Sequence, residues 1–227
     1  MMTSSTPVAT TVVNPITLRI TEIFRSLQGE ARHAGLPTVF VRLTGCPMRC
    51  VYCDSAYAFH GGDKQSIDDI IKDVKNYSVR HVTVTGGEPL AQKNCHELLS
   101  KLCDLGYVVS LETGNAMDVS SVDKRVHIVL DIKTPASTEE QNNRYENLDH
   151  IADKDQLKFV LMNRDDYLWS KQFIEERDLA DKVEILFSPV ADELPASDLA
   201  NWILEDNLLV RFQMQLHKYL WGDVPGV

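Results

Sequence analysis

Two kinds of hydrophobic periodicity alternate along the chain and predict a fold of strands and helices. Short runs rich in apolar and β-branched residues recur, and the interior ones are nearly continuous, as in Val126-His127-Ile128-Val129-Leu130. Such runs are typical of parallel strands that are covered on both faces. The predicted strands are Ile16–Phe24, Thr38–Leu43, His81–Thr85, Tyr107–Glu112, His127–Ile132, Leu157–Leu161, Val183–Phe187 and Val210–Gln215.

Helical periodicity fills the segments between several of these strands. Ser66 precedes an acidic first turn and is a good N-cap, and Gly106 is a stop signal for the second helix. A proline near the start of the fourth helix suits the first helical turn. The predicted helices are Ile67–Asn76, Gln92–Leu105, Asp165–Arg177 and Pro195–Glu205.

Alternation of strands and helices predicts an α/β fold with right-handed crossovers. The chain has 227 residues, fewer than the roughly 250 that eight complete β/α units usually need. We therefore expect a partial, open β/α barrel, in which ligands bind at the C-terminal ends of the strands. Four polar or glycine-rich segments follow predicted strands and should meet there: the cysteine-rich segment 45–54, Gly86–Pro89, Thr113–Asn115 and Lys133–Pro135.

Composition narrows the class of protein. Apolar residues make up 44% of the chain, enough for a core, and no apolar run is long enough to span a membrane. Residues 1–15 contain no charged side chain and do not resemble a secretory signal, so we expect a disordered or extended tail, a single domain over residues 16–227 and a cytoplasmic protein.

Charge disfavours nucleic acid as a partner. The formal net charge is −10, and no run of Lys or Arg is longer than two residues. Such a surface repels phosphate backbones, so the sequence favours a small-molecule substrate.

Three closely spaced cysteines are the strongest chemical signal. Cys46, Cys50 and Cys53 form a C-x3-C-x2-C pattern that can hold one metal centre from a single loop and leaves a ligand position open. Zinc bound with a nearby His33 or His60 is the alternative on spacing alone. The remaining cysteines are Cys95 and Cys103, which we interpret as thiols on the buried face of a helix.

The cysteine pattern, followed about thirty residues later by Gly-Gly-Glu-Pro, resembles the radical S-adenosylmethionine superfamily. The resemblance implies a 4Fe–4S cluster on the three cysteines, with S-adenosylmethionine on the free iron. One electron from the cluster then generates a 5′-deoxyadenosyl radical that removes a hydrogen atom from the substrate. The cofactors carry this chemistry, so no side chain is assigned as catalytic.

Two further patterns indicate the substrate class. The side chains of Gln28 and Glu30, after the first strand, offer the donor and acceptors needed to read the edge of a 2-amino-pyrimidinone ring. Arg42 stands in an apolar strand, where a charge is costly unless it is paired. It is either a structural ion pair or a guanidinium fork for a substrate carboxylate.

Together with His217-Lys218-Tyr219-Leu220, these motifs resemble the 7-carboxy-7-deazaguanine synthase family, from about Ile20 to the C-terminus. The resemblance implies ring contraction of 6-carboxy-5,6,7,8-tetrahydropterin to 7-carboxy-7-deazaguanine with loss of ammonia, on the route to queuosine and other 7-deazapurines. It further implies a homodimer, and flavodoxin or ferredoxin as electron donor.

The same resemblance implies the site residues. Those expected to contact S-adenosylmethionine are Tyr52, Cys53, Asp54, Gly87, Glu88, Lys133, Thr134, Ser137, Ser188 and Pro189. Those expected to contact the substrate are Leu27, Gln28, Gly29, Glu30, Arg42, Thr85, His217 and Val227. Mg2+ is implied at Ser55, where many members of the family have threonine.

Two other functions remain open at this point. A radical enzyme that activates a glycyl radical on a partner protein would share the cysteines and Gly-Gly-Glu-Pro but would not need Gln28, Glu30 and Arg42 beside a pterin. A non-enzymatic zinc-binding module would be colourless, whereas a 4Fe–4S protein is brown.

Overall fold

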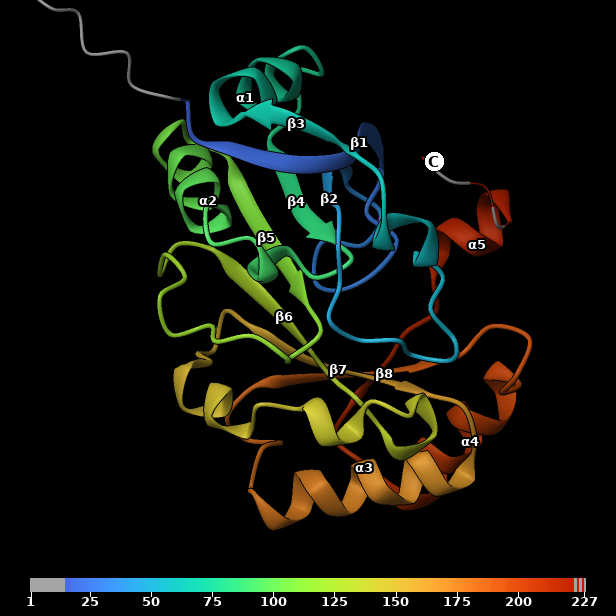
Figure 1. The fold of residues 1–227 in the computed structure, drawn as a ribbon. Coiled ribbons are helices and arrows are strands. Elements are labelled where there is room, and N and C mark those ends of the chain that lie inside the picture. Colours follow the sequence, from blue (N-terminus) through green and yellow to red (C-terminus); the bar gives the residue numbers. More distant parts are fainter. Residues whose placement is uncertain (1–14, 223, 225, 227) are drawn as a thin grey trace, which may run out of the picture.

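The computed structural model describes residues 15–222, 224 and 226, and its strands form one open sheet. The strands are β1 (Thr17–Leu27), β2 (Pro37–Leu43), β3 (Asp63–Ser66), β4 (His81–Gly86), β5 (Val108–Thr113), β6 (His127–Ile132), β7 (Gln156–Leu161), β8 (Glu184–Pro189) and β9 (Arg211–Phe212). Their order in the sheet is β3-β1-β2-β4-β5-β6-β7-β8-β9. Strands β2 and β4 to β9 run parallel, whereas β1 is antiparallel to β2 and β3. The sheet curves without closing, which confirms the predicted open barrel (Figure 1).

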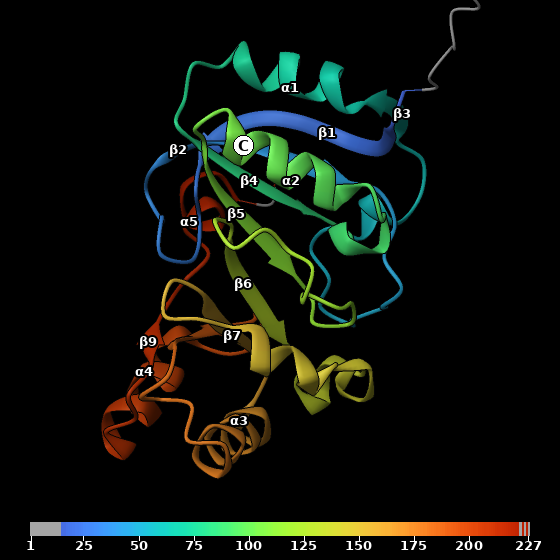
Figure 2. The same cartoon turned by 90° about the vertical axis from the view of Figure 1, so that its left-hand side faces the viewer.

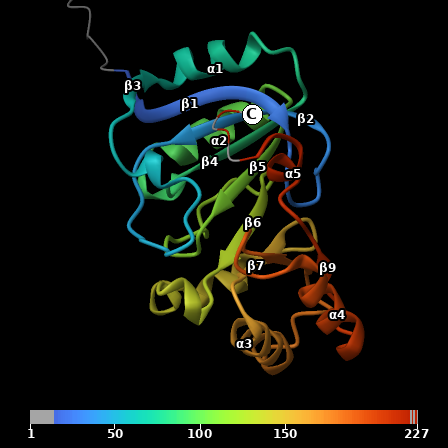
Figure 3. The same ribbon diagram turned by 90° about the vertical axis from the view of Figure 1, so that its right-hand side faces the viewer.

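The α-helices in the described residues are α1 (Ile67–Lys75), α2 (Cys95–Asp104), α3 (Arg164–Glu176), α4 (Ala196–Asp206) and α5 (Leu216–Trp221). Four of these five, α1 to α4, cover the outer side of this curved sheet. In Figure 2, α2 lies in front of the strands and α1 lies above β1 at the top of the view, whereas α5 lies on the opposite face, as the reverse view in Figure 3 shows. Among the described residues no helix is long and apolar enough to cross a membrane.

The two faces of each parallel strand have different environments. Leu111 of β5 and Leu130 of β6 belong to the main apolar core under the helices. The neighbouring residues Glu112 and Asp131 point the other way and line an internal cavity. The near-continuous apolar runs predicted strands that are covered on both faces, but only the face under α1 to α4 packs in the main apolar core, and the other face lines the cavity.

The sequence signals for helix ends, an N-cap at Ser66 and a stop at Gly106, are confirmed by the structure. The Ser66 side chain accepts a hydrogen bond from the Asp69 amide at 3.1 Å, and Gly106 has a φ of +84° after α2. The second helix was predicted to start at Gln92, but α2 starts three residues later, at Cys95, because a separate 3-10 turn at Pro89–Ala91 precedes it.

Two elements near the sheet edges were predicted wrongly. Strand β3 is a polar run with no apolar alternation, so nothing in the sequence pattern marks it. The predicted strand Val210–Gln215 pairs only over Arg211–Phe212, and a helix follows at Leu216. Beyond Phe212, the side chain of Gln213 turns inward and accepts a hydrogen bond from the Ala31 amide at 2.6 Å.

The loop of residues 28–36 closes one end of the barrel. The Arg32 amide donates to the Gln156 side chain at 2.8 Å, at the start of β7. The His33 ring packs against His81 and His127, at the starts of β4 and β6, with ring centroids 4.9 and 5.3 Å apart. Because these contacts lie at the N-terminal ends of the strands, the loop is a floor, and the cavity opens at the opposite end.

Candidate active site

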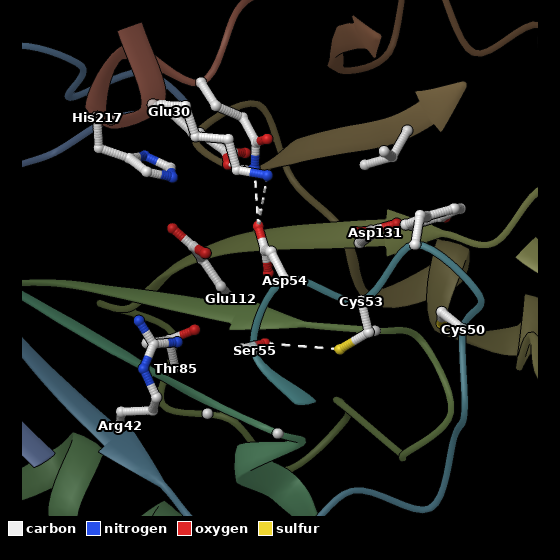
Figure 4. A pocket seen from close by; sticks show the side chains of 18 of the residues that line it. Glu30, Arg42, Cys50, Cys53, Asp54, Ser55, Thr85, Glu112, Asp131 and His217 are labelled. Carbon is white, nitrogen blue, oxygen red and sulfur yellow. Dashed lines mark hydrogen bonds and ion pairs between the residues drawn. The ribbon is translucent and has the colours of Figure 1, made fainter. Parts of the chain in front are cut away.

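A cavity of about 710 Å³ occupies the inside of the barrel, within the size range of small-molecule sites (Figure 4). It is lined by the C-terminal ends of the strands, as predicted, and by the floor loop and the C-terminal segment. The predicted site residues that line it are Leu27, Gln28, Gly29, Glu30, Arg42, Cys46, Cys50, Tyr52, Cys53, Asp54, Ser55, Thr85, Gly87, Lys133 and His217. Five other predicted residues lie behind its wall: Glu88, Thr134, Ser137, Ser188 and Pro189. Val227 lies outside the described residues, as do residues 1–14 of the predicted tail.

The three thiols lie on the loop that follows β2, and backbone contacts hold this loop. The Gly45 amide donates to the Ala58 carbonyl at 2.8 Å, and the Gly45 carbonyl accepts from the Glu88 amide at 2.8 Å. The Arg49 guanidinium donates to the Cys46 carbonyl at 2.8 Å and lies 4.3 Å from the centre of the Phe59 ring. The loop is therefore fixed from both sides, and the thiols of Cys46, Cys50 and Cys53 all face the cavity.

Two of the three thiols are protonated until a metal centre binds. Burial raises the pKa of Cys46 and raises that of Cys50 to about 11, so both are neutral at pH 7 until a metal centre takes their protons. Within the part of the chain that the structure describes, no three His, Cys, Asp or Glu side chains converge on one metal ion. His33, a ligand in the zinc alternative, packs instead on His81 at the floor.

Gly87 packs tightly against the cysteine loop. A Cβ atom at this position would lie 2.2 Å from the Gly45 carbonyl oxygen and 2.9 Å from the Cys46 Cβ. Both neighbours belong to the loop that carries the thiols, so a side chain here would displace the first of them. Glycine is thus required by a close backbone approach.

We expect Gly87→Ala to prevent normal loading of the cluster, because the added methyl group would push backbone atoms of the thiol loop. Gly114→Ala is the matched control: its nearest neighbour is the flexible end of Met48, at 2.2 Å, which can move aside. Iron and sulfide content after anaerobic reconstitution distinguishes the two variants. Equal loading in both would show that the contact at Gly87 does not matter.

Two buried polar atoms beside the thiols, the Tyr52 hydroxyl and Asp131 Oδ1, lack hydrogen-bond partners among the described atoms. Lys133 is buried and pairs with Asp131 Oδ2 at 3.0 Å, and its ammonium lies 5.9 Å from the centre of the Tyr52 ring. Burial raises the pKa of Tyr52 above its usual range, so the hydroxyl stays a donor. An unpartnered donor and acceptor on a cavity wall indicate a place for a polar ligand.

The Glu88 carboxylate is hydrogen-bonded to other residues of the protein. Its carboxylate accepts from the amides of Leu90 and Gly114, at 3.0 and 2.8 Å, and from the Thr113 hydroxyl at 2.9 Å. Burial raises its pKa. These bonds join the ends of β4 and β5, and a contact of Glu88 with S-adenosylmethionine stays a prediction.

The neighbouring turn supports the thiol loop from behind. The Ser137 hydroxyl donates to the Thr134 carbonyl at 2.6 Å, and the Ser137 carbonyl accepts from the Val51 amide at 3.2 Å. Ser188 and Pro189 are the buried last residues of β8. Contacts of these four predicted residues with S-adenosylmethionine also stay predictions.

The far half of the cavity carries a network of charged and amide side chains. Gln28 Nε2 donates to Thr83 Oγ1 at 3.1 Å and to Glu112 Oε1 at 3.3 Å. Glu30 forms an ion pair with the buried Lys158 ammonium. Burial, reinforced by the charge of Glu30, raises the pKa of Glu112. Burial opposes ionisation of Glu30, but Lys158 outweighs it and holds the pKa of Glu30 below its ordinary value.

Arg42 fits both interpretations that its sequence position allowed. Its Nε donates to Glu22 Oε1 at 2.7 Å, so a structural ion pair exists. The guanidinium also lines the cavity, beside Thr85 in the adjacent strand (Figure 4). It can therefore bind a carboxylate while it remains anchored to Glu22.

The C-terminal segment ties the floor to the thiol loop. Gln215 Nε2 donates to Glu30 Oε1 at 2.8 Å and to Asp54 Oδ2 at 3.0 Å. The Leu216 amide donates to the Gly29 carbonyl at 3.0 Å. Burial lowers the pKa of His217, so the imidazole that packs on Gly29 is neutral at pH 7. Ser55, the predicted Mg2+ ligand, has its hydroxyl 3.8 Å from Cys53 Sγ.

Sequence analysis did not assign several polar residues of the cavity to the site, among them Glu112, Asp131, Lys158 and Gln215. The first three interrupt otherwise apolar strands, which is the signal that singled out Arg42. Gln215 has no such signal, because its partners are distant in sequence.

The open barrel, the three thiols and the glycine packed on their loop define a radical S-adenosylmethionine protein. The model of the Radical SAM superfamily matches residues 40–151. QueE from Escherichia coli has the same fold: its crystal structure aligns with a TM-score of 0.74 and 21% sequence identity, covering 88% of this chain and 95% of that chain.

Curated relatives identify the family. The 7-carboxy-7-deazaguanine synthase of Chlorobaculum tepidum is 44% identical over 214 residues, covering 92% of this chain and 97% of the relative. The 7-carboxy-7-deazaguanine synthase of Koribacter versatilis is 40% identical over 226 residues, covering 92% of this chain and all of the relative. The chain belongs to the 7-carboxy-7-deazaguanine synthase family.

Proposed function

We propose that this chain converts 6-carboxy-5,6,7,8-tetrahydropterin to 7-carboxy-7-deazaguanine and ammonia, acting as a carbon–nitrogen lyase. The observation that carries the proposal is one cavity with two unlike halves. Three thiols form one half, and a network of amide, carboxylate and guanidinium groups forms the other. An activase that acts on a partner protein would have no use for such an enclosed polar network.

The thiol half fits a 4Fe–4S cluster with S-adenosylmethionine beside it. Cys46, Cys50 and Cys53 would hold the cluster, and the unpartnered Tyr52 hydroxyl and Asp131 carboxylate oxygen lie where a polar cofactor would find partners. When bound, these groups supply the one-electron chemistry that removes a hydrogen atom from the substrate. The protein orients the reactants and encloses them.

The polar half fits a pterin that bears a carboxylate. Gln28, Glu30 and Glu112 present an amide and two carboxyl groups to the donor–acceptor edge of the ring. Glu30 is ionised beside Lys158 and accepts from ring N–H groups, whereas the raised pKa of Glu112 suits a proton donor. The Arg42 fork would bind the carboxylate.

Three other features belong to the same proposal. Asp54 and Ser55 offer the hard oxygen ligands that Mg2+ prefers, at the edge of the cavity beside Cys53. We further propose a cytoplasmic homodimer that receives electrons from flavodoxin or ferredoxin. Exposed aromatic residues on α5, Tyr219 and Trp221, support an interface between two copies.

The test is an anaerobic assay of the reconstituted protein with reductant, S-adenosylmethionine, Mg2+ and the carboxytetrahydropterin, followed by mass spectrometry. Formation of 7-carboxy-7-deazaguanine supports the proposal. Formation of 5′-deoxyadenosine without it would mean that the substrate is wrong, and activity only with a large partner protein would favour the activase.

Arg42→Ala should raise the KM for the pterin by on the order of tenfold to a hundredfold, because a charge-assisted bond to the carboxylate is lost. Cleavage of S-adenosylmethionine should continue without forming product, since the cluster half of the cavity is untouched. Arg80→Ala, which removes an exposed arginine at the opposite end of the sheet, is the control. Loss of cleavage as well would mean that Arg42 is structural.

A further inference from the structure

We propose that Glu22 is a positioning residue. It holds the Arg42 guanidinium at a fixed position relative to the loop that carries the thiols. This inference rests on the proposed function, in which Arg42 binds the substrate carboxylate. Glu22 is not among the residues that line the cavity, so it would act only through its partners.

An irregularity in β1 brings Glu22 opposite Arg42. In the pairing of β1 with β2, Ile20 faces Leu43 and Glu22 faces Arg42, so one extra residue, Thr21, is accommodated between them. Without this bulge, Thr21 would oppose Arg42. Since a shift of one residue moves a side chain to the other face of a sheet, the bulge determines that a carboxylate stands beside the guanidinium.

A single oxygen of Glu22 joins two parts of the site. Glu22 Oε1 accepts from Arg42 Nε at 2.7 Å and from the Tyr57 hydroxyl at 2.7 Å. Tyr57 lies in the 3-10 turn Ala56–Phe59, four residues after Cys53. The carboxylate-binding group and the thiol loop are therefore tied to the same atom.

Aromatic rings complete the clamp around the guanidinium. The central carbon of the Arg42 guanidinium lies 5.8 Å from the centre of the Phe24 ring and 5.7 Å from that of Tyr57. The bond to Glu22 uses Nε, and the terminal nitrogens make no hydrogen bond to the described residues, so this edge can meet a carboxylate.

The functional consequence concerns distance. Hydrogen abstraction requires the reacting carbon of the substrate to stand close to the cofactor, and a misplacement of about 1 Å can reduce a rate by orders of magnitude. A guanidinium tethered to the thiol loop through Glu22 and Tyr57 holds the substrate carboxylate at a constant distance from the cluster end of the cavity. Glu22 thereby controls coupling between cofactor cleavage and product formation.

The experiment compares Glu22→Ala, Glu22→Gln and Tyr57→Phe with a control, Glu97→Ala, which breaks an exposed ion pair with Lys101 on α2. For each loaded protein we would measure kcat, KM for the pterin and the ratio of 5′-deoxyadenosine to product. Equilibrium binding of 7-carboxy-7-deazaguanine and of 7-deazaguanine, which lacks the carboxylate, gives a readout that does not depend on turnover.

We expect Glu22→Ala to raise KM and the 5′-deoxyadenosine-to-product ratio by about tenfold or more, and to lose the preference for the carboxylated ligand. Glu22→Gln keeps an acceptor for both donors and should restore most of the coupling. Tyr57→Phe should raise the ratio with a smaller change in KM, because Arg42 keeps its bond to Glu22.

Unchanged KM, coupling and ligand preference in Glu22→Ala would overturn the inference, even if the variant melted at a lower temperature. Failure of the proposed function would appear differently, as a wild-type protein that forms no 7-carboxy-7-deazaguanine and does not prefer the carboxylated ligand. The two failures are therefore distinguishable in one set of measurements.

Discussion

Replacement of Cys46, Cys50 or Cys53 by alanine is expected to abolish cluster assembly in each case, and with it the cleavage of S-adenosylmethionine. A cube held by three thiolates has no spare protein ligand, so the loss of one thiolate leaves one iron without its protein ligand. The measurement is iron and sulfide content after anaerobic reconstitution, together with the yield of 5′-deoxyadenosine. Both should fall to background.

Cys103→Ala provides the matched control. This thiol is half-buried on α2 and packs against the main core, away from the cavity wall. Its loss should leave the brown colour and the iron content unchanged. If a variant at one of the three loop positions kept a full complement of iron, that cysteine would not be a ligand, and the assignment of the cluster would fail.

The sequence predicted the architecture because its signals are local. Strand His127–Ile132 was predicted with its observed ends, and the caps at Ser66 and Gly106 formed as expected. The convergence of the thiol loop, Gly87 and Lys133 followed from parallel topology, which puts the C-terminal ends of the strands at one end of the barrel.

The polar half of the cavity was only partly predictable. A charged residue in an apolar strand singled out Arg42, and the same test applied to Glu112, Asp131 and Lys158 would have found them, because each must face the lumen. Interpreting those strands as covered on both faces obscured this. The signal was present in the alternation of side chains, with every second residue facing inward.

Other contacts had no sequence signal at all. Gln215 reaches Asp54 across 161 positions, and Glu22 meets Arg42 only because of the irregularity at Thr21. A bulge and a late turn of the chain depend on packing in three dimensions, which periodicity does not encode. Residues such as Gln215 and Glu22, which hold other site residues in place, are therefore the hardest to predict from sequence.

Lys158→Met is expected to destabilise the fold strongly at neutral pH. Lys158 and Glu30 are both buried and form an ion pair, and removal of the cation leaves a carboxylate in the barrel close to Glu112. Breaking one side of such a pair costs about 3–5 kcal/mol. Urea unfolding at pH 7.5 measures the loss. Lys101→Met, which removes an exposed cation on α2, should change little.

The dependence on pH distinguishes this mechanism from lost packing. In the wild type the folded-state pKa of Glu30 is lowered, so the pair's contribution is present above the unfolded pKa, near 4.5, and is lost as the pH falls through the folded value. Without Lys158, burial raises that pKa, and the variant loses stability as the pH rises. The gap between the two proteins should thus narrow from pH 7.5 to pH 5. Adding Glu30→Gln to Lys158→Met removes the buried charge and should recover much of the stability, whereas a gap independent of pH, with no recovery in the double variant, would mean that Lys158 acts through packing alone.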